Sequence, residues 1–210
     1  MGPRVYAAVA TLAILGVVLL APATASSRSS VPPPAVGINY ATLPGLQTGP
    51  VPWSADDGAT LRARLDRLDL PVLGAEQLDY HIHVHLDIFV HGVHIPVPAL
   101  VGINVTDEFL TVLHTHDASG VVHIESSSNK HYQLGKFFGV WGVRLNASCI
   151  GRYCASGGTS QLRTWVNGKP YKGKPARIVL TPHLEIVLTV GAKADVPSPI
   201  AHRFAWPPGL

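Results

Sequence analysis

Histidine alternates with apolar residues between Tyr80 and Val90. A β-strand sends successive side chains to opposite faces, so the polar residues of this segment are expected to share one face. They are His81, His83, His85 and Asp87. The apolar residues between them form the other face and predict burial against a core. Imidazole is the commonest metal ligand among protein side chains, so a strand face made of imidazoles indicates metal binding.

A second group of histidines lies on an expected hairpin whose turn is residues 117–120. With this turn, His114 pairs with His123, and His116 projects from the same face. Cross-strand neighbours have Cβ atoms about 4.5–5.5 Å apart. Bonds from histidine nitrogen to zinc are about 2.0–2.1 Å long and demand such closeness. The hairpin is therefore expected to bring three imidazoles onto one ion, with Glu125 one pleat beyond His123.

Residues two apart on a strand are separated by about 6.6 Å, so two imidazoles of the first strand can join the hairpin set, but three in a row cannot. The predicted metal ligands are His83, His85, His114, His116 and His123. Further ligands, or partners that orient the rings, are expected among His81, Asp87, Asp117 and Glu125. The remaining histidines are interpreted as surface residues: His91, His94, His131, His202, and His183 as a surface pair with Glu185.

The missing ligand types restrict the metal. Met1 is the only methionine, and the two cysteines are expected to be oxidised. The lack of soft ligands argues against Cu(I) carriage and blue-copper electron transfer. Imidazole with carboxylate suits Zn(II) and Cu(II), which we expect first, and also Fe(II) and Ni(II).

The N-terminal residues indicate export. An uncharged apolar run from Val5 to Leu20 precedes the small residues Ala23 and Ala25, which predicts a signal peptide over residues 1–25. An uncleaved anchor is the alternative, and it would be the chain's only contact with a membrane. Cys149 and Cys154 predict one local disulfide, which fits an oxidising compartment. We expect a secreted or extracytoplasmic, cell-envelope protein.

The charge of the chain excludes one class of partner. The formal net charge is +3, and it becomes +2 without Arg4 of the signal segment. This excess is too small to predict binding to nucleic acid.

The remaining chain is expected to form one α+β domain. Residues 26–53 are predicted to be a Pro/Ser/Gly-rich linker, residues 54–70 a helix, residues 80–191 the His-rich β-rich domain, and residues 192–210 a Pro-rich tail. Ser54 could cap the helix, although Gly58 leaves a later start open. The domain is expected to contain antiparallel hairpins and one short packed helix near 133–141, with later strands at 162–166, near Tyr171, at 177–180 and at 184–190.

Three segments, residues 80–88, 113–126 and 134–142, resemble those of an uncharacterised family of exported bacterial and archaeal proteins. This resemblance covers about residues 80 to 191 and implies an organisation, not an activity. The helix at 134–141, followed by residues 165–169 and 178–190, is similar to a β-grasp module of the transcobalamin C-terminal type. That similarity implies a β-grasp-like fold.

Three functions compete. The first is sequestration or sensing of a divalent metal. The second is a metal-dependent enzyme with an open coordination position, because His85 with Asp87 and His123 with Glu125 have the His-x-carboxylate spacing of Fe(II) sites. Motifs of zinc proteases and serine hydrolases are missing from the sequence. The third is a surface interaction module anchored by aromatic residues. Its candidate anchors are Trp141, Trp165, Phe204 and Trp206.

Overall fold

A mixed seven-stranded sheet organises the domain in the computed structural model, which describes residues 38–55 and 60–210. The expected signal peptide and the first part of the expected linker lie outside these residues. The sheet contains β1 (Tyr80–Val90), β2 (Val93–Ile95), β5 (Leu113–His114), β6 (Val121–Ser126), β9 (Gln161–Val166), β10 (Lys169–Pro170) and β11 (Leu184–Gly191). Its order is β10-β9-β11-β1-β6-β5, and β2 pairs with β1.

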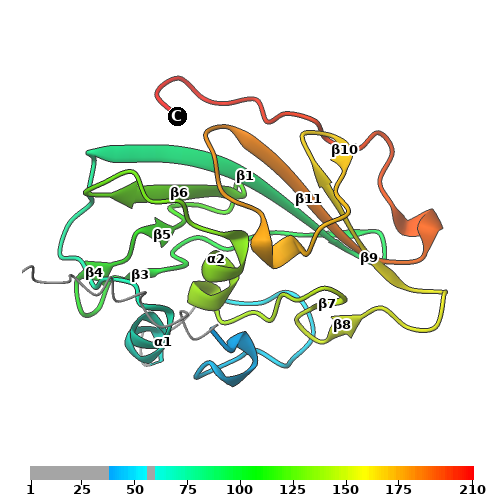
Figure 1. Cartoon of the computed structure of the whole chain (residues 1–210), viewed down its shortest axis with the longest axis horizontal. Coiled ribbons are helices and arrows are strands. Elements are labelled where there is room, and N and C mark those ends of the chain that lie inside the picture. Colours follow the sequence, from blue (N-terminus) through cyan, green and yellow to red (C-terminus); the bar gives the residue numbers. More distant parts are fainter. Residues whose placement is uncertain (1–37, 56–59) are drawn as a thin grey trace, which may run out of the picture. The chain divides into compact units, whose positions relative to one another are not determined.

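Helices and two small strand pairs complete the fold (Figure 1). The helices are α1 (Leu61–Leu68) and α2 (Leu134–Trp141), with 3-10 turns η1 (Tyr40–Thr42), η2 (Pro175–Arg177) and η3 (Lys193–Asp195). The small pairs are β3 (Ile103–Asn104) with β4 (Phe109–Leu110), and β7 (Cys149–Ile150) with β8 (Tyr153–Cys154). The α+β class expected from the sequence is therefore confirmed.

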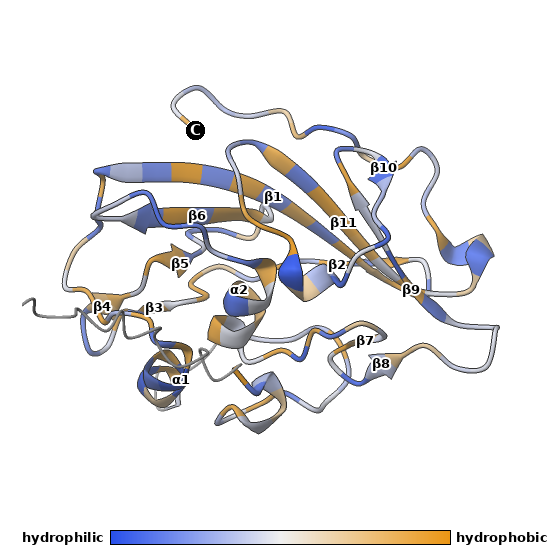
Figure 2. Cartoon of the chain, in the orientation of Figure 1, coloured by the Kyte–Doolittle hydropathy of each residue, from blue (hydrophilic) through white to orange (hydrophobic). Residues whose placement is uncertain are grey.

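Strand β1 is central because it pairs on both sides. It runs parallel to β11 and antiparallel to β6. Polar and apolar residues alternate along β1 and β11, as the colouring of Figure 2 shows. The apolar face of β1 is buried at Val84, Leu86 and Ile88, so the alternation predicted from the sequence does place one face in the core.

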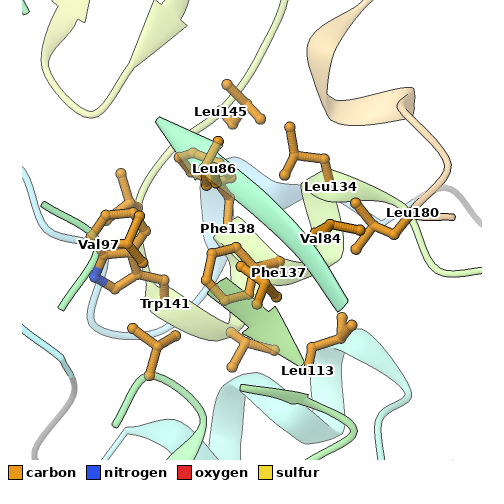
Figure 3. Close-up of a cluster of buried hydrophobic side chains, with 14 of the residues drawn as sticks. Val84, Leu86, Val97, Leu113, Leu134, Phe137, Phe138, Trp141, Leu145 and Leu180 are labelled. Atoms are coloured by element: carbon orange, nitrogen blue, oxygen red, sulfur yellow. The ribbon is translucent and has the colours of Figure 1, made fainter. Parts of the chain in front are cut away.

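Helix α2 covers this apolar face (Figure 3). Leu134, Phe137, Phe138 and Trp141 recur at helical spacing, and each has at most 1% of its surface exposed. Gly142 ends the helix in the left-handed conformation, with φ of 74°. The burial of Trp141 removes it from the candidate surface anchors.

Helix α1 is shorter than the expected helix over residues 54–70. It begins after Thr60, and Ser54, the expected cap, is not helical. The helix ends at Asp69, which has a left-handed backbone conformation, shortly before Pro71. The later start agrees with the helix-breaking effect of Gly58, although residues 56–59 lie outside the described part of the chain.

Residues 38–53 differ from the linker expected for this stretch. Leu43 and Trp53 are buried in the core, and the Trp53 ring meets Trp141 edge to face with centroids 5.8 Å apart. This part of the chain therefore packs against the domain. The apolar side chains at 43, 46, 51 and 53 pack in or against the core, although prolines surround them in the sequence.

The strand predicted at 177–180 does not form, so this prediction is wrong. Residues 175–177 form η2, and Ile178 and Leu180 are buried without joining the sheet. The Ile178 carbonyl accepts a hydrogen bond from the Leu134 N–H, and the Leu180 N–H donates to the Tyr132 carbonyl. The apolar run thus supports the start of α2, although its β-branched composition is typical of a strand.

Other local predictions are confirmed. His114 pairs with His123 across β5 and β6, and β5 contains only Leu113 and His114. Strands β9 and β11 agree with the strands expected at 162–166 and 184–190, and Cys149 and Cys154 form a disulfide. Within residues 38–55 and 60–210, the helices are too short to cross a membrane.

The tail after β11 lies across the histidine side of the sheet, away from α2 (Figure 1). Phe204 stacks on the His85 ring with centroids 4.0 Å apart. Trp206 stacks on His183 at 4.7 Å and lies 6.3 Å from the His83 ring. The tail therefore covers part of the polar face of β1.

Candidate metal centre

Three histidines form a row across three adjacent strands. His83 of β1 is the register partner of His123 of β6, and His123 is also the partner of His114 of β5. Two residues along, on the same face, His81 is opposite Glu125. Because side chains at paired positions project from the same face of a sheet, the register brings these imidazoles and the carboxylate together.

Glu125 lies at the centre of the cluster. Its Oε1 atom is 3.1 Å from His81 Nε2, 3.3 Å from His123 Nδ1 and 3.6 Å from His114 Nε2. Its side chain is 1% exposed. Burial alone would raise the pKa of Glu125, but the adjacent His114 and His123 rings hold that pKa well below its usual range. The carboxylate is therefore ionised and available to a cation.

The backbone orients the His114 ring. Its Nδ1 atom lies 2.9 Å from the Thr111 carbonyl oxygen, which can only accept a hydrogen bond, so Nδ1 carries the proton. The neutral ring then has its lone pair on Nε2, the tautomer that metal-binding histidines require. This Nε2 lies 3.2 Å from Nε2 of His116.

The nitrogens of His114 and His116 are spaced as ligand atoms around one ion would be. Bonds of about 2.0–2.1 Å at tetrahedral angles separate two ligand atoms by about 3.3–3.4 Å. Burial, followed by the nearby His114 and His123 rings, lowers the pKa of His116, so the ring is neutral at pH 7 and keeps a lone pair on one of its two nitrogens. His116 is also the exposed member of the set, and its Nε2 lies 3.3 Å from the exposed Glu76.

The structure contains three clusters that could hold a metal ion within the described residues. The first is His114, His116, His123 and Glu125, the second is His81, His83 and His123, and the third is His85, Asp87 and Glu185. Within each cluster, one ligand atom per residue lies within 4.8 Å of all the others. The first two clusters share His123.

Two buried polar atoms of the first two clusters lack a protein partner. They are Nε2 of His83 and Oε2 of Glu125, two of the four such side-chain atoms among the described residues. Burial, together with the His123 and His81 rings, lowers the pKa of His83 to about 4, so this ring is neutral at pH 7. A buried polar group without a partner is costly, and a bound cation would satisfy both atoms.

His85 lies in the third cluster, apart from the other predicted ligands. Its Nδ1 is 2.9 and 3.1 Å from the two carboxylate oxygens of Glu185, and its Nε2 is 2.9 Å from the Ser119 carbonyl oxygen. Burial opposes protonation, but the hydrogen bond and charge of Glu185 outweigh it and raise the pKa of His85. Both ring nitrogens therefore act as donors, and neither offers a lone pair to a metal ion in this arrangement.

Two expected carboxylates also lie elsewhere. Asp87 contacts the exposed His94, with Oδ1 3.1 Å from Nε2. Asp117 accepts a hydrogen bond from the Ser119 N–H at 2.9 Å and thereby stabilises the turn before β6. Neither side chain orients a ring of the first two clusters.

The expected surface pair of His183 and Glu185 does not form. Glu185 is 1% exposed and binds His85, whereas His183 stacks on Trp206. The pairing of β1 with β11 places Glu185 opposite His85, and no local sequence signal indicates that pairing. The other expected surface histidines are exposed: His91, His94, His131 and His202.

Comparison of the chain with protein-family models, curated proteins and solved structures gave no match. The fold and the side-chain geometry therefore define the class: an α+β domain with histidine clusters that could hold a metal ion.

Proposed function

We propose that this protein binds a divalent transition metal outside the cytoplasm, through His114, His116, His123 and Glu125. The observation that carries the proposal is the convergence of four ligand atoms, from three imidazoles and one carboxylate, within 4.8 Å of one another. Two features prepare this set for a cation. The His114 tautomer is fixed by the Thr111 carbonyl, and the Glu125 carboxylate is ionised and buried.

The ligand types favour Zn(II) or Cu(II). Imidazole suits both ions, and a tetrahedral set of three nitrogens and one oxygen is a common zinc environment. The only two cysteines form a disulfide and offer no thiolate. The same set suits Ni(II) and Fe(II), which remain alternatives.

Location outside the cytoplasm is supported by two independent features. The disulfide is typical of proteins in oxidising compartments. The N-terminal sequence has the pattern of a signal peptide. A protein exported in this way would sequester or sense the metal in the cell envelope or the medium.

We also propose that the domain is β-grasp-like and related to the uncharacterised exported family that its sequence resembles. The support is the strand order: a central parallel pair, β1 with β11, lies between β6 on one side and β9 with β10 on the other. Helix α2 follows β6 in the chain and covers the sheet, and β9 comes after it.

An enzyme is the second candidate, and the contacts of His116 favour it. This residue is 42% exposed and touches Glu76, so it could leave the ion. The remaining His114, His123 and Glu125 would then form a two-histidine, one-carboxylate set with open positions. Azide added to the Co(II)-loaded protein would shift the visible spectrum if an open position exists, and would leave it unchanged if the shell is closed.

Isothermal titration of metal-free protein with Zn(II) and Cu(II) tests the primary proposal. We expect the tightest binding event to weaken at least about 100-fold in His114→Ala/His116→Ala. The matched control is His94→Ala/His131→Ala, which also removes two histidines, both exposed and outside the three clusters. Equal affinity in the two double variants, or no binding by the parent, would contradict the proposal.

A further inference from the structure

We propose that the histidine face holds two metal ions rather than one. The second ion is bound by His81 and His83 and shares Glu125 with the first. This inference rests on the proposed function and adds a second site, which makes the centre dinuclear.

The number of available ligands exceeds what one ion takes. The first two clusters together contain six side chains: His81, His83, His114, His116, His123 and Glu125. Zinc in proteins is almost always four-coordinate in structural sites and expands at most to five in catalytic ones. His81 and His83 are therefore surplus to the first ion, yet their ring centroids lie 4.5 Å apart, and each ring lies within 5.7 Å of the His123 ring.

The two ends of the row belong to different clusters: among the described residues, no group that could hold one ion contains both His83 and His114. Neighbouring strands are about 4.8 Å apart, so β1 and β5, on either side of β6, are separated by about 10 Å. Two ligands of one ion are at most about 4.2 Å apart when each bond is about 2.1 Å long. An ion held by His114 thus lies toward β5, and an ion held by His83 lies toward β1.

Glu125 lies between the two clusters and can serve both ions. Oε1 of Glu125 contacts His81 of the second cluster at 3.1 Å and His114 of the first at 3.6 Å. Oε2 of the same carboxylate is buried without a partner. A carboxylate with one oxygen toward each ion is a common bridge in two-metal sites, whose ions are about 3.5–4 Å apart.

His83 provides an independent indication of a second site. Its Nε2 atom is buried without a hydrogen-bond partner, although the ring lies between His81 and His123. The side chain of His81 is 31% exposed, so the second ion has a path from solvent along this ring.

Metal stoichiometry under saturating Zn(II), measured by equilibrium dialysis and elemental analysis of the full-length protein, tests the inference. We expect two equivalents in the parent and in the control His94→Ala/His131→Ala. We expect one equivalent in His81→Ala/His83→Ala and one in His114→Ala/His116→Ala. Circular dichroism of each variant verifies that it is folded.

The outcomes separate the two proposals. One equivalent in the parent, retained in His81→Ala/His83→Ala and lost in His114→Ala/His116→Ala, would overturn the second ion and leave the proposed function intact. No bound metal in the parent would overturn both. Two equivalents in His81→Ala/His83→Ala would show that the second ion lies elsewhere.

Trp206 gives a test that leaves every ligand in place. Its ring is 6.3 Å from His83, whereas Trp53 and Trp141 are buried in the core. Cu(II) quenches nearby tryptophan fluorescence, so the ion bound by His83 should quench an emission component that Trp206→Phe removes. If Cu(II) quenches the parent and Trp206→Phe equally at two equivalents, no ion lies beside His83, and the inference is overturned.

Discussion

The Nδ1 atom of His114 lies 2.9 Å from the carbonyl oxygen of Thr111, three residues earlier in the chain. This contact determines that the other ring nitrogen, Nε2, faces Glu125 and His116 with its lone pair. The ring is buried, so the backbone holds it in position whether or not an ion is bound. The first cluster is therefore arranged by strand register and by one backbone carbonyl before metal arrives.

The first prediction concerns the charge of Glu125. Glu125→Gln keeps the shape of the side chain but removes the negative charge that faces three imidazoles. We expect Zn(II) affinity, measured by competition with a chromogenic chelator, to fall by about 10–100-fold or more. Glu76→Gln is the matched control, because the Glu76 carboxylate is exposed and contacts the outer ligand His116. An unchanged affinity in Glu125→Gln would mean that the carboxylate is not a ligand.

The second prediction assigns His85 a structural role. His85→Ala leaves the Glu185 carboxylate buried without its partner, which typically costs about 3–5 kcal/mol. We expect urea unfolding to show a loss of this order, while the metal stoichiometry of the folded variant stays at the parental value. A variant with parental stability and less bound metal would show instead that His85 is a ligand.

The contribution of the His85–Glu185 pair to stability depends on pH, and the direction of this dependence follows from the pKa of His85. Because the pKa of His85 is raised in the folded state, its contribution to stability is complete below the unfolded pKa of about 6.5. It is lost as pH rises through the folded pKa. The difference in stability between the parent and His85→Ala should therefore be smaller at pH 9 than at pH 6.

The third prediction concerns His83 in the metal-free protein. Its folded pKa is about 4, below the usual 6.5, because of burial and the neighbouring His123 and His81 rings. Between pH 6.5 and 4 the unfolded chain binds a proton that the folded chain excludes, so stability falls as pH decreases. The full shift corresponds to about 3 kcal/mol.

His83→Gln removes this titration and should flatten the stability curve between pH 6.5 and 4. The exposed His131→Gln serves as the control and should follow the parent. Urea unfolding at half-unit pH steps, with a chelator present, measures both curves. Parallel curves for the parent and His83→Gln would contradict the lowered pKa.

The fourth prediction separates the disulfide from the metal centre. The Cys149–Cys154 bond closes a short loop, and a loop of this length is worth about 2 kcal/mol in the chain-entropy model. We expect Cys149→Ala/Cys154→Ala to lose stability of this order and to keep full metal affinity, because the loop contributes no residue to the three clusters. A large loss of metal binding in a folded variant would be inconsistent with this separation.

Local patterns in the sequence predicted the features that depend on periodicity. The alternation in β1 indicated which histidines share a face, and the turn at 117–120 indicated the pairing of His114 with His123, which is confirmed. The apolar spacing in α2 likewise predicted its buried face. Each of these features depends on neighbours fewer than about ten residues apart.

Features that depend on strand order could not be predicted in this way. Glu185 meets His85 only because β11 pairs with β1, 100 residues away in sequence. The strand predicted at 177–180 does not form for a related reason. Its backbone groups hydrogen-bond to Tyr132 and Leu134, at the start of α2. The Thr111 carbonyl has no sequence signature at all, because every residue carries one.

Anomalous diffraction from crystals grown with Zn(II), collected on both sides of the zinc absorption edge, tests the central claim most directly. We predict an anomalous peak about 2.0–2.2 Å from His114 Nε2, from a ring nitrogen of His116 and from a carboxylate oxygen of Glu125. Zinc found only at exposed histidines such as His94 and His131, with none at these atoms, would contradict the account.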